Sequence, residues 1–234
     1  MPELFKGGIL EMSTEPLLPA GAVEPWSAYP LNRVAVVLTI VLLIVELLDY
    51  FRVFPHLLRC LPRWKGNVEL EHSVSLARTR NTVALVAALI FVLTADYFSL
   101  VAPSFRLQVP PEWRLVVCAG LLAGMIVVRR LCYLATPMRS RTSEFASTMR
   151  HTIYNYLILL VSFMLPSALL LAAVGMDLSA ARTVLIAEIA VFYLVHLIRS
   201  SQILHSRYGS LATILYLCAL EILPVGILIF VCTL

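Results

Sequence analysis

Charged residues are scarce in this sequence. Asp, Glu, Lys and Arg make up 14% of its 234 residues, whereas 60% are hydrophobic and the mean hydropathy is +0.89. A soluble domain of this length does not need so much apolar surface, but several helical spans of about 20 residues require it. The composition therefore excludes an ordinary soluble protein and predicts an all-α, polytopic membrane helix bundle.

Motifs of the common enzyme classes are also absent. The sequence has no Gly-rich phosphate loop, no His-Glu-x-x-His zinc motif and no Gly-x-Ser-x-Gly nucleophile turn. The five cysteines are scattered, odd in number and mostly inside apolar runs, which is typical of small core residues. The sequence thus predicts no metal, no cofactor and no nucleic-acid partner. It does not decide whether the protein is an enzyme, although the missing motifs favour a non-enzymatic role.

The first 30 residues lack the basic region and apolar run of a signal peptide. Two acid–proline pairs, Glu15–Pro16 and Glu24–Pro25, disfavour regular structure. We therefore expect residues 1–30 to form a weakly ordered arm outside the cytoplasm.

Six apolar stretches follow, and together they predict one membrane domain over residues 31–234. The predicted spans cover residues 31–50, 82–101, 113–134, 152–174, 180–199 and 211–233. Pro166 and Pro224 lie inside the fourth and sixth spans and predict helix kinks, because proline has no N–H to donate.

The distribution of Lys and Arg predicts the orientation of the bundle. Thirteen of the 18 lie on or next to the first, third and fifth connections, and five lie on the other side. Cytoplasmic loops carry the excess of positive charge, so both termini are expected outside the cytoplasm.

Residues 51–65 alternate apolar and cationic side chains at helical spacing. This pattern fits a helix lying in the membrane interface, and it equally fits a juxtamembrane loop with stop-transfer charges. Arginine forks suit phosphate, although topology alone could account for the Arg clusters. The predicted contacts with lipid headgroups are Arg52, Arg59, Arg63, Lys65, Arg129 and Arg130.

Two carboxylates interrupt the last two spans, Glu188 and Glu221. A charge inside the hydrocarbon is costly, so each is expected to face a partner or a wet cavity. The spans are joined by about ten residues, which predicts antiparallel neighbours with both carboxylates near mid-depth. They could form a proton- or cation-handling site, or each could be a structural carboxyl bonded to a backbone carbonyl such as the one freed by Pro224.

The candidate intramembrane polar site gathers the polar residues predicted around these carboxylates. Its members are Glu188, Glu221, His196, Arg199, Tyr216 and Asn155. His151 and His196 could in principle hold a haem or a metal, but no further ligand is suitably spaced. We interpret both as interfacial histidines that bond to the protein.

The nonapeptide Tyr216–Pro224, with Cys218 and Glu221 inside it, resembles the closing motif of a Bacteroidota inner-membrane family, domain of unknown function 4271. The last three spans are similar too, with Tyr154–Tyr156 opening the fourth. The resemblance covers roughly residues 116–234. It implies a multi-pass protein of the bacterial inner membrane, carries no reaction, and marks Glu221 and Pro224 for testing.

Three functions are compatible with these features. We expect a non-enzymatic membrane subunit that supports or assembles an envelope complex, with anionic lipid headgroups on the cytoplasmic side and another membrane protein as its partners. One alternative is a small proton-coupled transporter or lipid flippase that uses Glu188 and Glu221. The other is a membrane-embedded lipid-modifying enzyme, which lacks a visible nucleophile–base pair.

Overall fold

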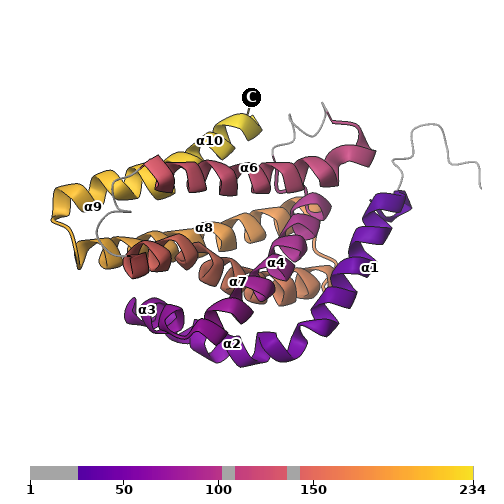
Figure 1. Ribbon diagram of the computed structural model, residues 1–234. Helices are drawn as coiled ribbons and strands as arrows, with labels where there is room; N and C mark the ends of the chain where they lie inside the picture. The colour runs from indigo at the N-terminus through magenta and orange to yellow at the C-terminus, as the bar shows by residue number, and fades with distance from the viewer. Residues whose placement is uncertain (1–25, 102–108, 136–142, 234) are drawn as a thin grey trace, which may run out of the picture.

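The computed structural model describes residues 26–101, 109–135 and 143–233, and every regular element within these ranges is helical (Figure 1). The elements are η1 (Trp26–Ala28), α1 (Pro30–Val45), α2 (Leu47–Cys60), α3 (Lys65–His72), α4 (Val74–Tyr97), η2 (Pro111–Trp113), α6 (Arg114–Ala135), α7 (Ser143–Ala173), α8 (Leu178–His205), α9 (Ser210–Leu217), the π-helical η4 (Cys218–Ile222) and α10 (Leu223–Thr233). The predicted all-α class is confirmed.

Five segments are long and apolar enough to cross a membrane, and the bent pair of α1 and α2 makes a sixth if it counts as one span. The five are Val74–Tyr97, Pro111–Ala135, Ser147–Ala173, Leu178–His205 and Ser210–Phe230. The chain is therefore a multi-pass membrane protein. Which side faces the cytoplasm stays a prediction.

The first predicted span, 31–50, is broken into two helices in the structure. α1 ends at Val45, and α2 begins at Leu47 after a bend of 71°. The 16 residues of α1 extend about 24 Å, which is shorter than a hydrocarbon core of about 30 Å. Polar contacts hold the chain at the bend, since Glu46 accepts a hydrogen bond from Thr82 (3.3 Å) and Tyr50 donates to Ser162 (2.8 Å).

The sequence left open whether residues 51–65 form an interfacial helix or a juxtamembrane loop. The segment is helical as far as Cys60. Its apolar face is not turned to lipid, because Val53, Leu57 and Cys60 are completely buried against the bundle. The apolar face of an amphipathic helix can pack on protein as well as on a membrane surface. In α2 this face packs on the rest of the bundle.

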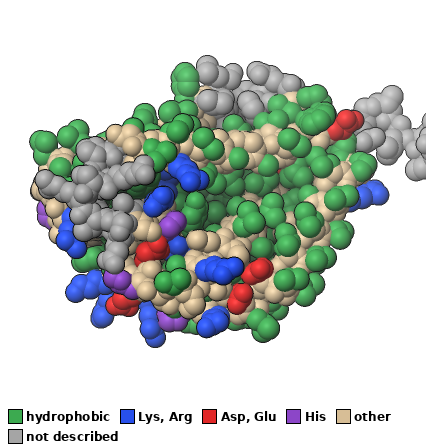
Figure 2. Space-filling view, viewed as in Figure 1, with side chains coloured by type: hydrophobic (Ala, Val, Ile, Leu, Met, Phe, Trp, Pro, Cys, Tyr) green, Lys and Arg blue, Asp and Glu red, His purple; other side chains and the backbone are tan. Residues whose placement is uncertain are grey.

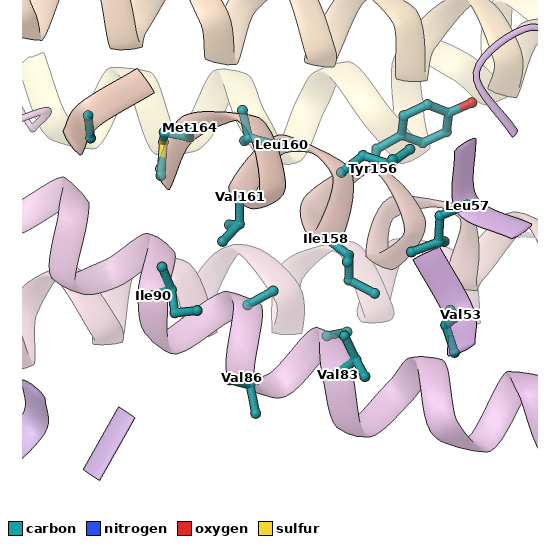
Figure 3. Packing of buried hydrophobic residues seen from close by; sticks show 14 of the residues in the cluster. Val53, Leu57, Val83, Val86, Ile90, Tyr156, Ile158, Leu160, Val161 and Met164 are labelled. Carbon is teal, nitrogen blue, oxygen red and sulfur yellow. The ribbon is translucent and has the colours of Figure 1, made fainter. Parts of the chain in front are cut away.

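The centre of the bundle is formed by α7, which packs against α8 and α4. Figure 1 shows α6 beside the run from α9 to α10 along one side, and α2 and α3 on the opposite side. The main hydrophobic core joins α2, α4 and α7 through side chains such as Leu57, Val83 and Ile158 (Figure 3). A smaller cluster, containing Tyr133, Met149 and Leu220, joins α6 to α7 and to η4.

One end of the bundle collects most of the cations. This end contains the last residues of α2 and α6, the short helix α3, and the turn from α8 to α9 (Figure 1). Most Lys and Arg side chains visible in Figure 2 lie in the half towards this end, on the left. We call it the basic end.

Most of the predicted N-terminal arm, residues 1–25, lies outside the described residues. Of its last five residues, Trp26–Ala28 form η1. The Trp26 indole donates to the Asp96 carboxylate at 2.7 Å and packs edge-on against Tyr97. This part of the arm is therefore tied to the end of α4.

Gly66 lies where α3 packs closely against the end of α2. A Cβ added there would lie 2.9 Å from the Arg59 carbonyl oxygen and 3.1 Å from the Cys60 nitrogen. Both are backbone atoms, so a side chain would force the two helices apart.

We expect Gly66→Ala to lower the free energy of unfolding by about 1–3 kcal/mol, the usual cost of overpacking. Thermal unfolding of the detergent-solubilised protein measures it. Gly226→Ala is the control, because a Cβ on Gly226 has no atom within 4 Å. Equal stability of the two variants would contradict the packing argument.

Candidate functional site

The last span changes its helical geometry just before Pro224. In η4 the Leu223 N–H bonds to the Cys218 carbonyl, five residues back instead of four. Pro224 has no N–H to offer the Leu220 carbonyl, and a π turn is one way a helix accommodates such a loss. Glu221 lies inside this π turn and is only 2% exposed.

The Glu221 carboxylate accepts hydrogen bonds from three side chains. Arg129 binds it with two nitrogens, at 2.6 Å to Oε1 and 3.2 Å to Oε2. Tyr133 donates to Oε1 at 3.0 Å, and His196 Nε2 lies 2.9 Å from Oε2. A carboxylate only accepts, so His196 carries a proton on Nε2. The bidentate arginine makes this a strong, directional pair.

Arg129 uses its remaining donors on the backbone of α7. It donates to the Arg150 carbonyl at 2.9 Å and to the Met149 carbonyl at 3.3 Å, and its guanidinium lies 5.0 Å from the centre of the Tyr133 ring. Buried charges are tolerated only when their donors and acceptors are satisfied. The pair therefore fastens α6, α7, α8 and η4 to one another.

Aromatic groups close the other side of the site. Tyr193 donates to the Glu221 carbonyl at 3.0 Å, and the rings of Tyr156 and Tyr193 lie 5.3 and 6.3 Å from the His196 ring. His196 Nδ1 and, one turn on, Ser200 Oγ are buried and have no hydrogen-bond partner among the described residues.

The structure brings only two of the six predicted site residues together, Glu221 and His196. Glu188 instead accepts a hydrogen bond from Ser167 at 2.7 Å and lies roughly 12 Å along α8 from His196. The expected pairing of Glu188 with Glu221 is therefore wrong. Glu188 and Glu221 each bond to side chains of the helices that their own helix face contacts.

The other three predicted members lie elsewhere. Arg199 donates to the Leu61 carbonyl at 2.9 Å, Tyr216 packs on Tyr208 at 5.2 Å, and Asn155 donates to Asn67 at 2.8 Å. These contacts tie helices at separate points and do not belong to the Glu221 network.

The expected mid-depth position of Glu221 stays a prediction. The carboxylate lies near the middle of its own span, Ser210–Phe230, whereas its partners on α6 and α7 lie nearer one end of theirs. Arg129 lies six residues, roughly 9 Å, before α6 ends at Ala135, and the Met149 carbonyl belongs to the first turn of the span Ser147–Ala173. The partners of Glu221 on α6 and α7 are therefore nearer the basic end than the centre of the bundle.

Arg129 was expected to contact lipid headgroups, but it is 6% exposed and bonds to Glu221. In the sequence, Arg129 and Arg130 resemble a pair of charges that ends a span. In the structure only Arg130 is exposed. One feature of the sequence could have indicated that Arg129 faces the protein. Arg129 and Tyr133 are four residues apart and therefore lie on the same helix face. Arg52, Arg59, Arg63, Lys65 and Arg130 are exposed, and their headgroup contacts stay predictions.

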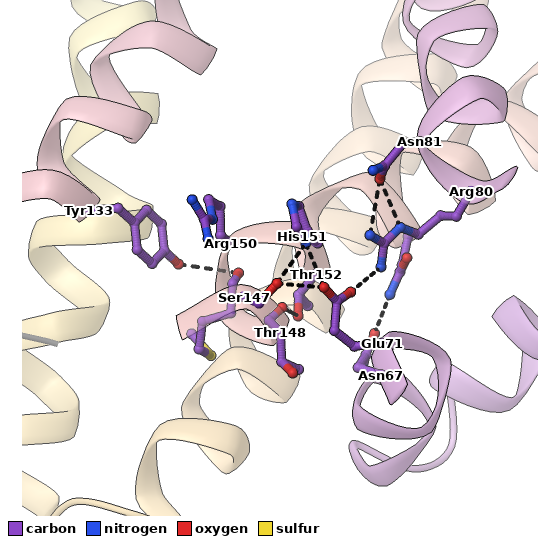
Figure 4. Close-up of polar contacts among 12 residues, drawn as sticks. Asn67, Glu71, Arg80, Asn81, Tyr133, Ser147, Thr148, Arg150, His151 and Thr152 are labelled. Carbon is purple, nitrogen blue, oxygen red and sulfur yellow. Dashed lines mark hydrogen bonds and ion pairs between the residues drawn. The ribbon is translucent and has the colours of Figure 1, made fainter. Parts of the chain in front are cut away.

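A second polar cluster surrounds Glu71 on α3 (Figure 4). Its carboxylate bonds to Arg80 at 2.7 Å, Ser147 at 2.6 Å and His151 at 2.9 Å, so it joins α3, α4 and α7. Burial raises the pKa of Glu71, but the hydrogen bonds from these three residues outweigh burial and lower the pKa to about 2. The carboxylate is therefore ionised in the folded protein at neutral pH.

Ser147, His151 and Glu71 do not form a catalytic relay. Both Ser147 and Glu71 approach the same His151 nitrogen, Nδ1, at 3.3 and 2.9 Å. A nucleophile–base–acid triad needs the hydroxyl on one ring nitrogen and the carboxylate on the other. Among the described residues, no group of three or more His, Cys, Asp or Glu side chains is arranged to hold a metal ion.

We expect Arg129→Gln and Glu221→Gln each to cost about 3–5 kcal/mol, because each leaves an unpaired buried charge. The double variant should cost clearly less than the sum, since it leaves neither charge. Unfolding in detergent measures this cycle. Glu188→Gln, which affects only one bond to Ser167, should cost about 1 kcal/mol. Additive losses for Arg129 and Glu221 would rule out the pair.

The low pKa of Glu71 makes its contribution to stability dependent on pH. The contribution is complete above the unfolded pKa of about 4.3 and is lost as the pH falls through the folded value of about 2. Glu71→Gln should therefore lower stability at pH 7, by up to about 3 kcal/mol, and the difference from wild type should shrink below pH 4.3. Melting curves from pH 7 to pH 3 test this. Glu69→Gln, at an exposed position of the same helix, should show no such trend.

The chain matches a known protein family. A family model described as "Domain of unknown function (DUF4271)" covers residues 34–231, which include α2, α3 and the whole Glu221 network. No curated protein and no solved structure matches the chain. The protein is a multi-pass membrane protein that belongs to the DUF4271 family.

Proposed function

We propose that this protein is a non-enzymatic membrane subunit that binds another integral membrane protein through α6. The observation that carries the proposal is the exposure of this helix. Only 11% of the apolar stretch in the span Pro111–Ala135 is buried inside the bundle, against 39% for Val74–Tyr97 and for Ser147–Ala173. Most of α6 is thus available to a neighbour in the membrane.

Small residues lie on this exposed surface. Gly120 and Gly124 are one turn apart, Ala119 and Ala123 precede them, and all four are exposed. A Cβ on either glycine would have no atom within 4 Å. Small residues four apart let a second helix approach closely in a membrane, where packing rather than hydrophobicity drives association.

The Glu221 network supports a fixed role for α6. Arg129 holds the helix to α7 and η4, so the small-residue face is presented on a rigid element. Both Glu221 oxygens are already occupied by donors, which weighs against proton coupling at this carboxylate. We further propose that the protein lies in the bacterial inner membrane with its basic end in the cytoplasm, where it supports an envelope complex. The charge distribution and the family resemblance support this part of the proposal.

We expect the wild-type protein, purified in mild detergent after crosslinking in membranes, to carry a different membrane protein in fixed stoichiometry. Gly120→Leu/Gly124→Leu should reduce that recovery about tenfold or more, because the added side chains keep the partner helix away.

Gly226→Leu is the matched control, since Gly226 is also exposed in a membrane helix with open space around it. It should retain the partner. A wild-type protein that purifies alone, or a double variant that keeps its partner, would overturn the proposal.

A further inference from the structure

A cavity of about 170 Å³ lies between α6 and α7 near the basic end. The two helices are bridged there by side chains, since Arg129 and Tyr133 reach across to backbone carbonyls at the start of α7. Figure 4 shows Tyr133, Arg150 and His151 close together in this region. Arg129, Arg130 and Arg150 all line the cavity.

The charge of the cavity is one-sided. Arg130 and Arg150 are exposed, and their guanidinium groups make no hydrogen bond or ion pair with the described residues. Arg129, although paired with Glu221 behind it, also belongs to the wall, and the His151 ring lies beside it. No described carboxylate lines the cavity. Convergent arginine forks are suited to the oxygens of a phosphate group.

The cavity also changes polarity with depth. α6 runs towards the basic end and α7 runs away from it (Figure 1). Ile126 therefore lies one turn deeper than Arg130, and Ile153 nearly one turn deeper than Arg150. Cations stand at the basic end, and apolar side chains stand on the side towards the middle of the bundle. A phospholipid has the same order of polarity, whereas a free phosphate ion does not.

We propose that this cavity binds the phosphate of an anionic phospholipid headgroup, held by Arg130 and Arg150, with the first part of an acyl chain against Ile126 and Ile153. A zwitterionic lipid fits less well, because none of the described lining residues is a carboxylate that could pair with its ammonium group. The inference does not rest on the proposed partner of α6.

Native mass spectrometry of the delipidated protein, supplied with phosphatidylglycerol, phosphatidylcholine or inorganic phosphate, tests the proposal. Wild type should retain phosphatidylglycerol in preference to phosphatidylcholine. Arg130→Gln and Arg150→Gln should each weaken phosphatidylglycerol binding about tenfold, which corresponds to about 1.4 kcal/mol. Ile153→Trp, which fills the deeper part and leaves the charges, should weaken it as well.

Arg78→Gln/Arg207→Gln is the matched control, since it removes two exposed cations that do not line this cavity. It should bind phosphatidylglycerol as wild type does, and melting curves confirm that each variant is folded. Unchanged binding by Arg130→Gln/Arg150→Gln, or an equal loss in the control, would overturn the site. Binding of inorganic phosphate without any lipid preference would overturn the lipid as its ligand.

Discussion

The ion pair between Arg129 and Glu221 is the constraint on which the arrangement of the helices depends. Hydrocarbon offers no water to a buried charge, so each group must find all its partners within the protein. Arg129 does so by reaching α7 and η4 together, and Glu221 does so by drawing donors from α6 and α8. α6 also contacts α4 but buries little of its apolar surface in the bundle, so this ion pair is a main polar tie that holds the helix in place.

Five of the six spans could be predicted approximately from hydropathy, because about 20 apolar residues in a row have few other uses. Glu221 stood out for the same reason, as a charge where charge is costly. Its partner could not be predicted. A single sequence gives the depth of a residue along its own helix, but not the rotation of that helix or the neighbour it meets. The predicted partners of Glu188 and Arg129 were therefore wrong: Glu188 bonds to Ser167, and Arg129 bonds to Glu221.

The segment at α2 shows a related difficulty. Its alternating apolar and cationic residues indicate a two-faced helix, yet the pattern is the same whether lipid or protein covers the apolar face. Val53 and Leu57 are covered by the bundle, which the sequence could not show. The bend at Glu46 was not predicted either, and the contact found there joins Glu46 to Thr82, 36 residues away in the sequence.

The order of synthesis gives the Arg129–Glu221 pair a consequence of its own. Arg129 precedes its counter-charge by 92 residues, so at about 5–20 residues per second the ribosome delivers Glu221 roughly 5–20 s later. During that interval the nascent chain holds an arginine whose carboxylate has not yet been made. A chain truncated before its final helix keeps this defect permanently, which distinguishes it chemically from the finished protein for any protease that surveys the bilayer.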